Sequence, residues 1–198
     1  LQRGRPAAIG HRSSNKPLTG NAALTAGHQQ ALLAWHVVTP PPGHTDHYAL
    51  ALGNLVLGGQ AGRLFDILRE RNPLAYTVWA TRSTGIDGGI GSYGLATTPE
   101  QVPRAQRLLR DTLQQMAADG PSDAELLRAK RMLLGGTAMR LQRASGRAGA
   151  RLRADMYGIP STKQQLEQRL EEVTRNDVHD TMASVLGRDG LWVRVMPS

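Results

Sequence analysis

The chain has 198 residues, 40% of them hydrophobic, and contains no cysteine. Without cysteine it can form no disulfide, thiolate metal site or cysteine nucleophile. It also has no apolar run of about 18 residues that could span a membrane. The formal net charge of +8 raises the question of nucleic-acid binding, which the positions of the bases help to decide.

The positive charge is concentrated in two stretches. Residues 1–16 carry four bases and no acid, and residues 122–157 carry eight bases and three acids. Such stretches can bind nucleic acid, but an arginine-rich helix face exposed to solvent explains them more simply. The few aromatic residues do not interleave with these arginines. We therefore expect no base-stacking surface and no nucleic-acid partner.

The N-terminal part differs in composition from the rest. Residues 1–27 are rich in Arg, Gly, Ser, Asn and Pro, which predicts an extended lead-in before a single domain over residues 28–198. Since the first residue is leucine, we expect a fragment or a processed product. The sequence accordingly leaves both the bacterial periplasm and the cytoplasm open.

The first half of this domain predicts a strand followed by helices. Residues 31–39 are a continuous apolar run that ends at three prolines, as is typical of a buried strand. Residues 46–57 are apolar on nearly all sides, as in a buried helix. Gly58 and Gly59 end that helix, and residues 61–71 predict a second one.

The second half predicts a hairpin, further helices and a last strand. A helix is expected to open with Thr98 as N-cap, Pro99 in the first turn and Gln101 reaching back. Pro103 predicts a bend or a later start. We expect strands over residues 74–82, 88–97 and 191–195, and helices from residue 122, over 161–169 and over 176–186. This order predicts an α+β fold, a two-layer α/β sandwich in which helices cover a mostly antiparallel sheet.

Three familiar site patterns are weak or missing. His44 and His47 are a close pair, but catalytic zinc needs about three protein ligands and none is indicated nearby. The glycine pattern of residues 89–94 falls in an expected strand, whereas a dinucleotide site needs a strand-to-helix turn. No Gly-x-Ser-x-Gly elbow is present. We therefore predict no metal site in this chain.

Arg69 and Tyr76 form the remaining candidate site. Arg69 lies near the end of an expected helix and Tyr76 at the start of the expected strand. Arginine offers several fixed N–H donors and tyrosine one O–H, so both could be aimed at one substrate oxygen. Spacing alone favours a simpler interpretation, in which Arg69 pairs with Glu70 or Asp66 and Tyr76 packs in the core.

The block over residues 58–78 adds a family resemblance. It is similar to a block of the insulinase/pitrilysin zinc metallopeptidases, in which a glycine turn precedes Ser-Arg-Leu-Phe, Leu-Arg-Glu and Gly-Leu-Ala-Tyr-Ser-Val. Ala61-Gly62 and Asn72-Pro73 depart from that pattern. The matching residues are Gly58, Gly59, Arg63, Leu64, Phe65, Leu68, Arg69, Glu70, Leu74, Ala75, Tyr76 and Val78. Weaker likeness in the same order extends over residues 28–196.

The resemblance implies the C-terminal, inactive domain of a processing-peptidase-like enzyme, one half of a clamshell around a peptide. In that family the arginine and tyrosine matched by Arg69 and Tyr76 contact the substrate near the cleaved bond. The glycine turn helps to capture substrate in some relatives, which makes Gly58 and Gly59 candidate binding residues.

The family's inverted zinc motif, His-x-x-Glu-His, is missing from the chain. The resemblance therefore implies that zinc is held by a homologous partner domain or subunit, and that this domain alone is inactive. Two alternatives stay open: a purely structural member of the same family within a larger complex, and, less favoured, a basic nucleic-acid-binding domain.

Overall fold

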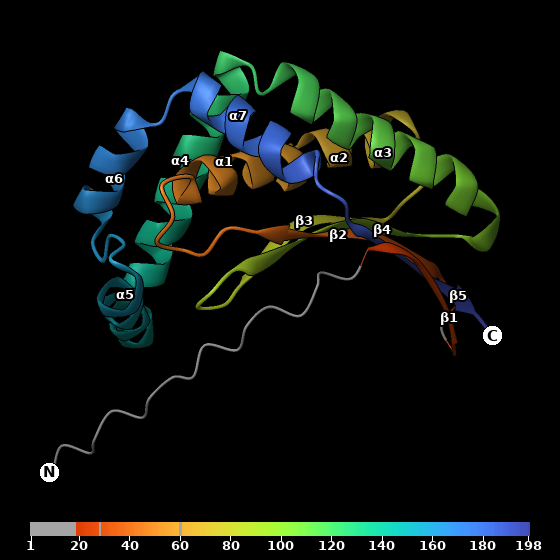
Figure 1. Ribbon diagram of the computed structural model, residues 1–198, viewed down its shortest axis with the longest axis horizontal. Coiled ribbons are helices and arrows are strands. Elements are labelled where there is room, and N and C mark those ends of the chain that lie inside the picture. The colour runs from red at the N-terminus through yellow and green to blue at the C-terminus, as the bar shows by residue number, and fades with distance from the viewer. Residues whose placement is uncertain (1–18, 28, 60) are drawn as a thin grey trace, which may run out of the picture.

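The computed structural model describes residues 19–27, 29–59 and 61–198, which form two layers (Figure 1). One layer is a five-stranded sheet in the order β1-β5-β2-β4-β3. Its pairs are antiparallel except for β1 and β5, which run parallel. The strands are β1 (Gly20–Ala26), β2 (Ala31–Thr39), β3 (Thr77–Thr84), β4 (Gly89–Thr97) and β5 (Leu191–Pro197).

The other layer consists of helices, which lie on one side of the sheet and extend past one of its ends (Figure 1). The helical segments are α1 (His47–Gly58), α2 (Arg63–Phe65), the π-helix η1 (Asp66–Arg71), the 3-10 turn η2 (Pro99–Gln101), α3 (Val102–Asp119), α4 (Asp123–Leu141), α5 (Ala144–Tyr157), α6 (Lys163–Glu172) and α7 (Arg175–Leu186). The predicted fold class, helices over a mostly antiparallel sheet, is confirmed. None of the helices described in this part of the chain has the length and apolar character needed to cross a membrane.

The core lies between the two layers. Alternate side chains of β2, Leu33, Trp35 and Val37, are buried in the same cluster as residues of α1 and α3, as the period of two in a strand requires. The fully buried Tyr93 of β4 donates its hydroxyl to Asn54 Oδ1 of α1 over 2.7 Å. This bond satisfies two polar groups that would be costly to bury alone, and it fixes α1 above the sheet.

Several expected boundaries are corrected by the structure. Residues 20–26, expected in an extended lead-in, form β1 and pair with β5; residues 1–18 and residue 28 lie outside the described residues. The helix expected over 61–71 is instead a short α-turn followed by a π-helix. The strand expected from residue 74 begins at Thr77.

The prolines explain another boundary. Pro99 opens a 3-10 turn, and α3 begins only at Val102, so that Pro103 falls in the first turn of α3. A proline is tolerated there because its missing N–H would have no intrahelical partner. The predicted later start is confirmed. Thr98 does occupy the N-cap position of the 3-10 turn, but its side chain makes no capping bond.

Candidate functional site

Arg63 anchors the start of the 63–78 segment to the neighbouring helix. Its guanidinium donates to both carboxylate oxygens of Glu125 over 2.8 and 2.9 Å, and to the carbonyl oxygen of Gly120 over 2.7 Å. The bond from Arg63, with help from Ser122, holds the pKa of Glu125 at about 2. Glu125 also closes the capping box of α4 with Ser122. One carboxylate therefore joins α2 to the first turn of α4.

The chain then turns sharply between η1 and β3. The N–H groups of Leu74 and Ala75 both donate to the carbonyl oxygen of Leu68 over 3.1 Å. Thr97 of β4 donates its hydroxyl to the carbonyl oxygen of Leu74 over 2.6 Å. These bonds place Tyr76 just ahead of β3, at the end of the sheet where β4 finishes.

Arg69 and Tyr76 are brought together at this turn. The Arg69 guanidinium carbon lies 5.0 Å from the centre of the Tyr76 ring and 4.8 Å from the centre of the Phe65 ring. Arg69 Nη1 donates to the Tyr76 carbonyl oxygen over 3.3 Å. A guanidinium over two aromatic faces is attracted by both rings, so the pair has a defined relative position before any ligand arrives.

The competing interpretations of the pair are not supported. Tyr76 does not pack in the core, because 77% of its surface is exposed. Asp66 pairs with Arg71 over 2.8 Å. Arg69 Nε reaches Glu70 only at 4.0 Å, between exposed side chains, a contact that contributes little.

An open cavity of about 330 Å³ adjoins the pair. It is formed where the start of β2, the end of β4 and the turn before β3 meet, and its lining residues are Gln30, Arg69, Pro73, Leu74, Ala75, Tyr76, Ala96, Thr97 and Thr98. A guanidinium and a phenol hydroxyl at such an opening can donate to a carbonyl or carboxylate oxygen of a ligand. The geometry therefore suits an oxygen-rich, peptide-like group.

Gly58 and Gly59 are not among the residues that line this cavity. Gly58 ends α1 against β3: a Cβ there would lie 2.5 Å from Ala80 Cβ and 2.7 Å from Ala80 N. At Gly59 a Cβ would lie 2.9 Å from the carbonyl oxygen of Leu55. Both glycines thus permit close packing, and their contact with substrate stays a prediction.

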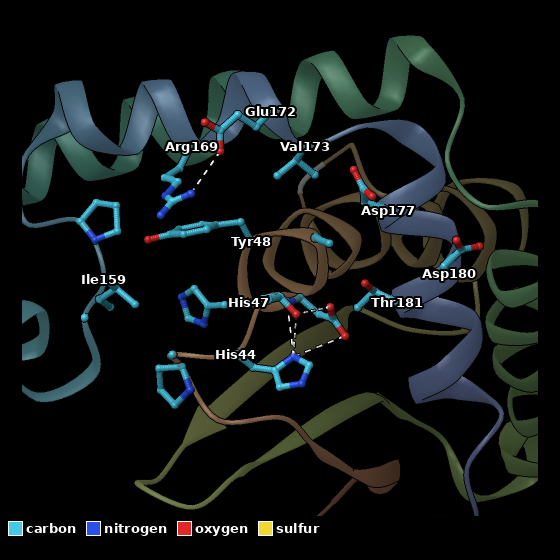
Figure 2. A pocket seen from close by; sticks show the side chains of 17 residues that line it. His44, His47, Tyr48, Ile159, Arg169, Glu172, Val173, Asp177, Asp180 and Thr181 are labelled. Atoms are coloured by element: carbon cyan, nitrogen blue, oxygen red, sulfur yellow. Dashed lines mark hydrogen bonds and ion pairs between the residues drawn. The ribbon is translucent and has the colours of Figure 1, made fainter.

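His44 and His47 line a different and larger cavity, of about 620 Å³, at the start of α1 (Figure 2). Its walls include Pro42, which follows β2, whereas the Arg69 cavity includes Gln30, which precedes that strand. Nine strand residues span about 30 Å, so the two cavities lie at opposite ends of β2. Figure 2 shows Tyr48 and Arg169 projecting into the larger cavity beside His47.

The histidine pair does not fit zinc. His47 Nδ1 faces the guanidinium of Arg82 at 3.3 Å, and burial followed by the Arg82 charge lowers the pKa of His47 to about 4. His44 Nδ1 accepts from the Asp46 N–H over 3.3 Å. Within the described ranges, no group of three or more His, Cys, Asp or Glu side chains could hold a metal ion.

One contributor to the site was not predicted. The Phe65 ring lies against the Arg69 guanidinium, as the Tyr76 ring does, and so helps to hold the guanidinium in place. The signal was available, because residues four apart on a helix share a face.

The fold and this half-open site define a two-layer α/β domain without a metal centre of its own in the described residues. The sequence model of the peptidase M16 inactive domain matches residues 12–133. An uncharacterized zinc protease of Mycobacterium tuberculosis is 30% identical over 193 residues, which cover 95% of this chain and 44% of that protein.

Solved structures show the same fold. The peptidase M16 inactive domain from Pseudomonas fluorescens superposes with a TM-score of 0.84 at 23% identity, covering 98% of this chain and 47% of that one. The inactive peptidase domain of a putative zinc protease from Bordetella parapertussis gives a TM-score of 0.74 at 23% identity, covering 87% and 95%.

The chain belongs to the peptidase M16 family and corresponds to its inactive domain. The resemblance to the insulinase/pitrilysin metallopeptidases is therefore confirmed. The chain spans less than half the length of the mycobacterial zinc protease that it matches.

Proposed function

We propose that this domain is the non-catalytic half of a zinc metalloendopeptidase, and that Arg69 and Tyr76 bind the peptide near its scissile bond. The observation that carries the proposal is the exposed Tyr76 ring held against the Arg69 guanidinium at the mouth of a cavity. An exposed aromatic that is fixed by its neighbours, and not by the core, is typical of a binding residue.

Peptide hydrolysis builds negative charge on the carbonyl oxygen of the bond that is cleaved. Donors aimed at that oxygen lower the barrier because they bind the transition state more strongly than the substrate. Arginine carries five N–H donors, and the bond to the Tyr76 carbonyl uses one of them. The remaining N–H groups and the Tyr76 hydroxyl would serve the substrate.

The shallow form of the site agrees with a role shared between two domains. A peptide enclosed between two halves contacts a concave surface on each, so each half alone presents an open hollow. The zinc and the water it activates would belong to a homologous domain or subunit, since His44 and His47 do not fit the metal. Gly58 and Gly59 would form part of the chamber wall.

The test is a peptidase assay of the complex with the zinc-bearing domain, using the wild-type chain, Arg69→Ala and Tyr76→Phe. We expect kcat/KM to fall by about a hundredfold to a thousandfold in each variant, as for the loss of one transition-state donor. Unchanged kcat/KM in both variants, with the complex still assembled, would exclude the proposed role.

The same preparation separates the two alternatives. A structural member of the family would assemble but cleave no peptide in any combination. A nucleic-acid-binding domain would bind duplex DNA with an affinity that falls steeply as salt rises. Peptide cleavage that depends on Tyr76 agrees with neither.

A further inference from the structure

The helix α5 protrudes at the end of the helical layer, away from the centre of the sheet (Figure 1). It packs on α4, and Ala150 is its buried residue. Its outer surface carries Leu152, 60% exposed, and Met156, 49% exposed. Met139, near the end of α4, is 70% exposed. Three large apolar side chains of α5 and the end of α4 are therefore exposed to solvent.

The same region is basic. Residues 139–156 carry five bases and one acid, Asp155. Arg147 and Arg151 are four residues apart and share one side of α5, next to the row that holds Leu152 and Met156. Arg143 directly precedes the helix. Among the described residues no acid pairs with Arg140 or Arg143, whereas Arg151 pairs with Asp155 over 3.1 Å.

The combination of charge and apolar exposure narrows the choice of partner. A second copy of the chain would present the same positive charge and be repelled. Nucleic acid would bind the arginines through its phosphates, which dominate its contacts with proteins. It would not bury the leucine and methionine side chains. The surface of an anionic bilayer can bind both the arginines and the apolar side chains. Its head groups attract bases, and the boundary between head groups and acyl chains accepts apolar side chains.

We propose that α5 and the end of α4, residues 139–156, form a basic-apolar corner that binds the surface of an anionic phospholipid membrane. Leu152 and Met156 would enter the head-group boundary, with Arg143 and Arg151 against lipid phosphates. The helix has 14 residues and few large apolar groups, so the binding is expected to be reversible and weakened by salt. This role is independent of peptide binding by Arg69 and Tyr76.

The experiment is co-sedimentation of the 198-residue chain with vesicles. One set contains phosphatidylglycerol mixed with phosphatidylcholine, and the other contains phosphatidylcholine alone. The variants are Arg143→Gln with Arg151→Gln, and Leu152→Gln with Met156→Gln. Arg147 is left intact because it donates to the carbonyl oxygens of Leu141 and Gln142 over 3.0 and 2.8 Å, and its loss could disturb the junction of the two helices.

Matched controls come from other surfaces of the chain. Arg107→Gln with Arg175→Gln removes two exposed arginines from α3 and α7. Leu24→Gln removes a leucine that is 58% exposed on β1, close to the exposure of Leu152. The basic N-terminal stretch is present in the wild type and in every variant, so its contribution to vesicle binding cancels in the comparison.

We expect binding to the anionic vesicles and not to phosphatidylcholine. Affinity should fall about fivefold for each arginine removed from the corner, and roughly threefold to tenfold when Leu152 and Met156 are replaced. The control variants should bind like wild type. The proposal is overturned by the absence of binding at low salt, or by corner variants that bind no worse than their controls. It is also overturned by equal binding to duplex DNA with no effect of Leu152→Gln and Met156→Gln.

Discussion

The Arg69 guanidinium lies over the face of the Tyr76 ring, 5.0 Å from its centre, and donates to the carbonyl oxygen of the same residue over 3.3 Å. The two candidate ligand-binding groups are thus in contact with each other before any substrate is bound. Because each one helps to position the other, their contributions to substrate binding should not be independent.

This contact predicts the result of a double-mutant cycle. Tyr76→Phe keeps the ring over Arg69 and removes only the hydroxyl, whereas Arg69→Ala removes donors and also frees Tyr76. We therefore expect the larger loss of kcat/KM from Arg69→Ala. The double variant should lose less than the product of the two single losses. The measurement is steady-state peptide cleavage by the complex with the zinc-bearing domain.

Thermal unfolding of the isolated chain provides the control for this cycle. Tyr76 is 77% exposed, so Tyr76→Phe should change stability by less than about 0.5 kcal/mol. A marked loss of stability in Tyr76→Phe would mean that its kinetic effect reports misfolding. If the loss of kcat/KM in the double variant equals the product of the two single losses, the contact between the two side chains does not contribute to function.

The ion pair between Arg63 and Glu125 leads to a prediction about stability. Both side chains are only 18% exposed and their closest atoms are 2.8 Å apart, so removing one partner leaves a charge without its main hydrogen bonds. We expect Arg63→Ala to cost about 2 kcal/mol, a fall of about 4–8 °C in Tm for a chain of this size. Differential scanning calorimetry of the purified chain measures it.

Glu125→Gln refines that experiment, because a glutamine can still close the capping box with Ser122. It should therefore cost less than Glu125→Ala, which removes both the pair and the cap. If Arg63→Ala and Glu125→Ala together cost as much as their sum, the two residues are not coupled.

The same carboxylate shows what local patterns can and cannot predict. The start of α4 at Ser122 was predicted from the sequence, because a capping box involves residues three apart. The bond from Arg63 was not predicted, since 62 residues separate it from Glu125. β1 was missed for a related reason: its sequence, GNAALTA, is largely exposed and lacks the apolar alternation of a half-buried strand. Its parallel pairing with β5 is a contact between the two ends of the chain.

For the candidate site too, local features were predicted and contacts between distant segments were not. Arg69 and Tyr76 were found because a short segment with a family resemblance carries both. The large cavity at the start of α1 was not anticipated, because four separate segments, around Pro42, Ile159, Arg169 and Asp177, meet to form it. Only the path of the whole chain places those segments together.

The buried His47 predicts how stability depends on pH. Its pKa is lowered from 6.5 to about 4, first by burial and then by Arg82. Between these values the unfolded chain binds the proton and the folded chain does not, so stability falls as pH falls through this window. We expect Tm to drop between pH 7 and pH 5, and His47→Gln to reduce that drop.

Two other groups, His36 and Glu125, also have lowered pKa values. Burial also lowers the pKa of His36, so part of the slope should remain in His47→Gln. Glu125, with its pKa held at about 2 by Arg63, affects stability only below about pH 4.5, outside the measured range. An unchanged slope in His47→Gln would show that His47 titrates normally in the folded chain.

Gly58 allows the packing role and the substrate role of the glycine turn to be separated. A Cβ at Gly58 would lie 2.7 Å from the backbone nitrogen of Ala80, which belongs to a paired strand and cannot move freely. We therefore expect Gly58→Ala to lower stability by about 1–3 kcal/mol through overpacking. Gly135→Ala, in α4 with nothing within 4 Å of the new Cβ, should instead raise stability by about 0.5–1 kcal/mol. If Gly58→Ala melts like wild type but weakens peptide cleavage, the glycine serves the substrate and not the packing of α1 on β3.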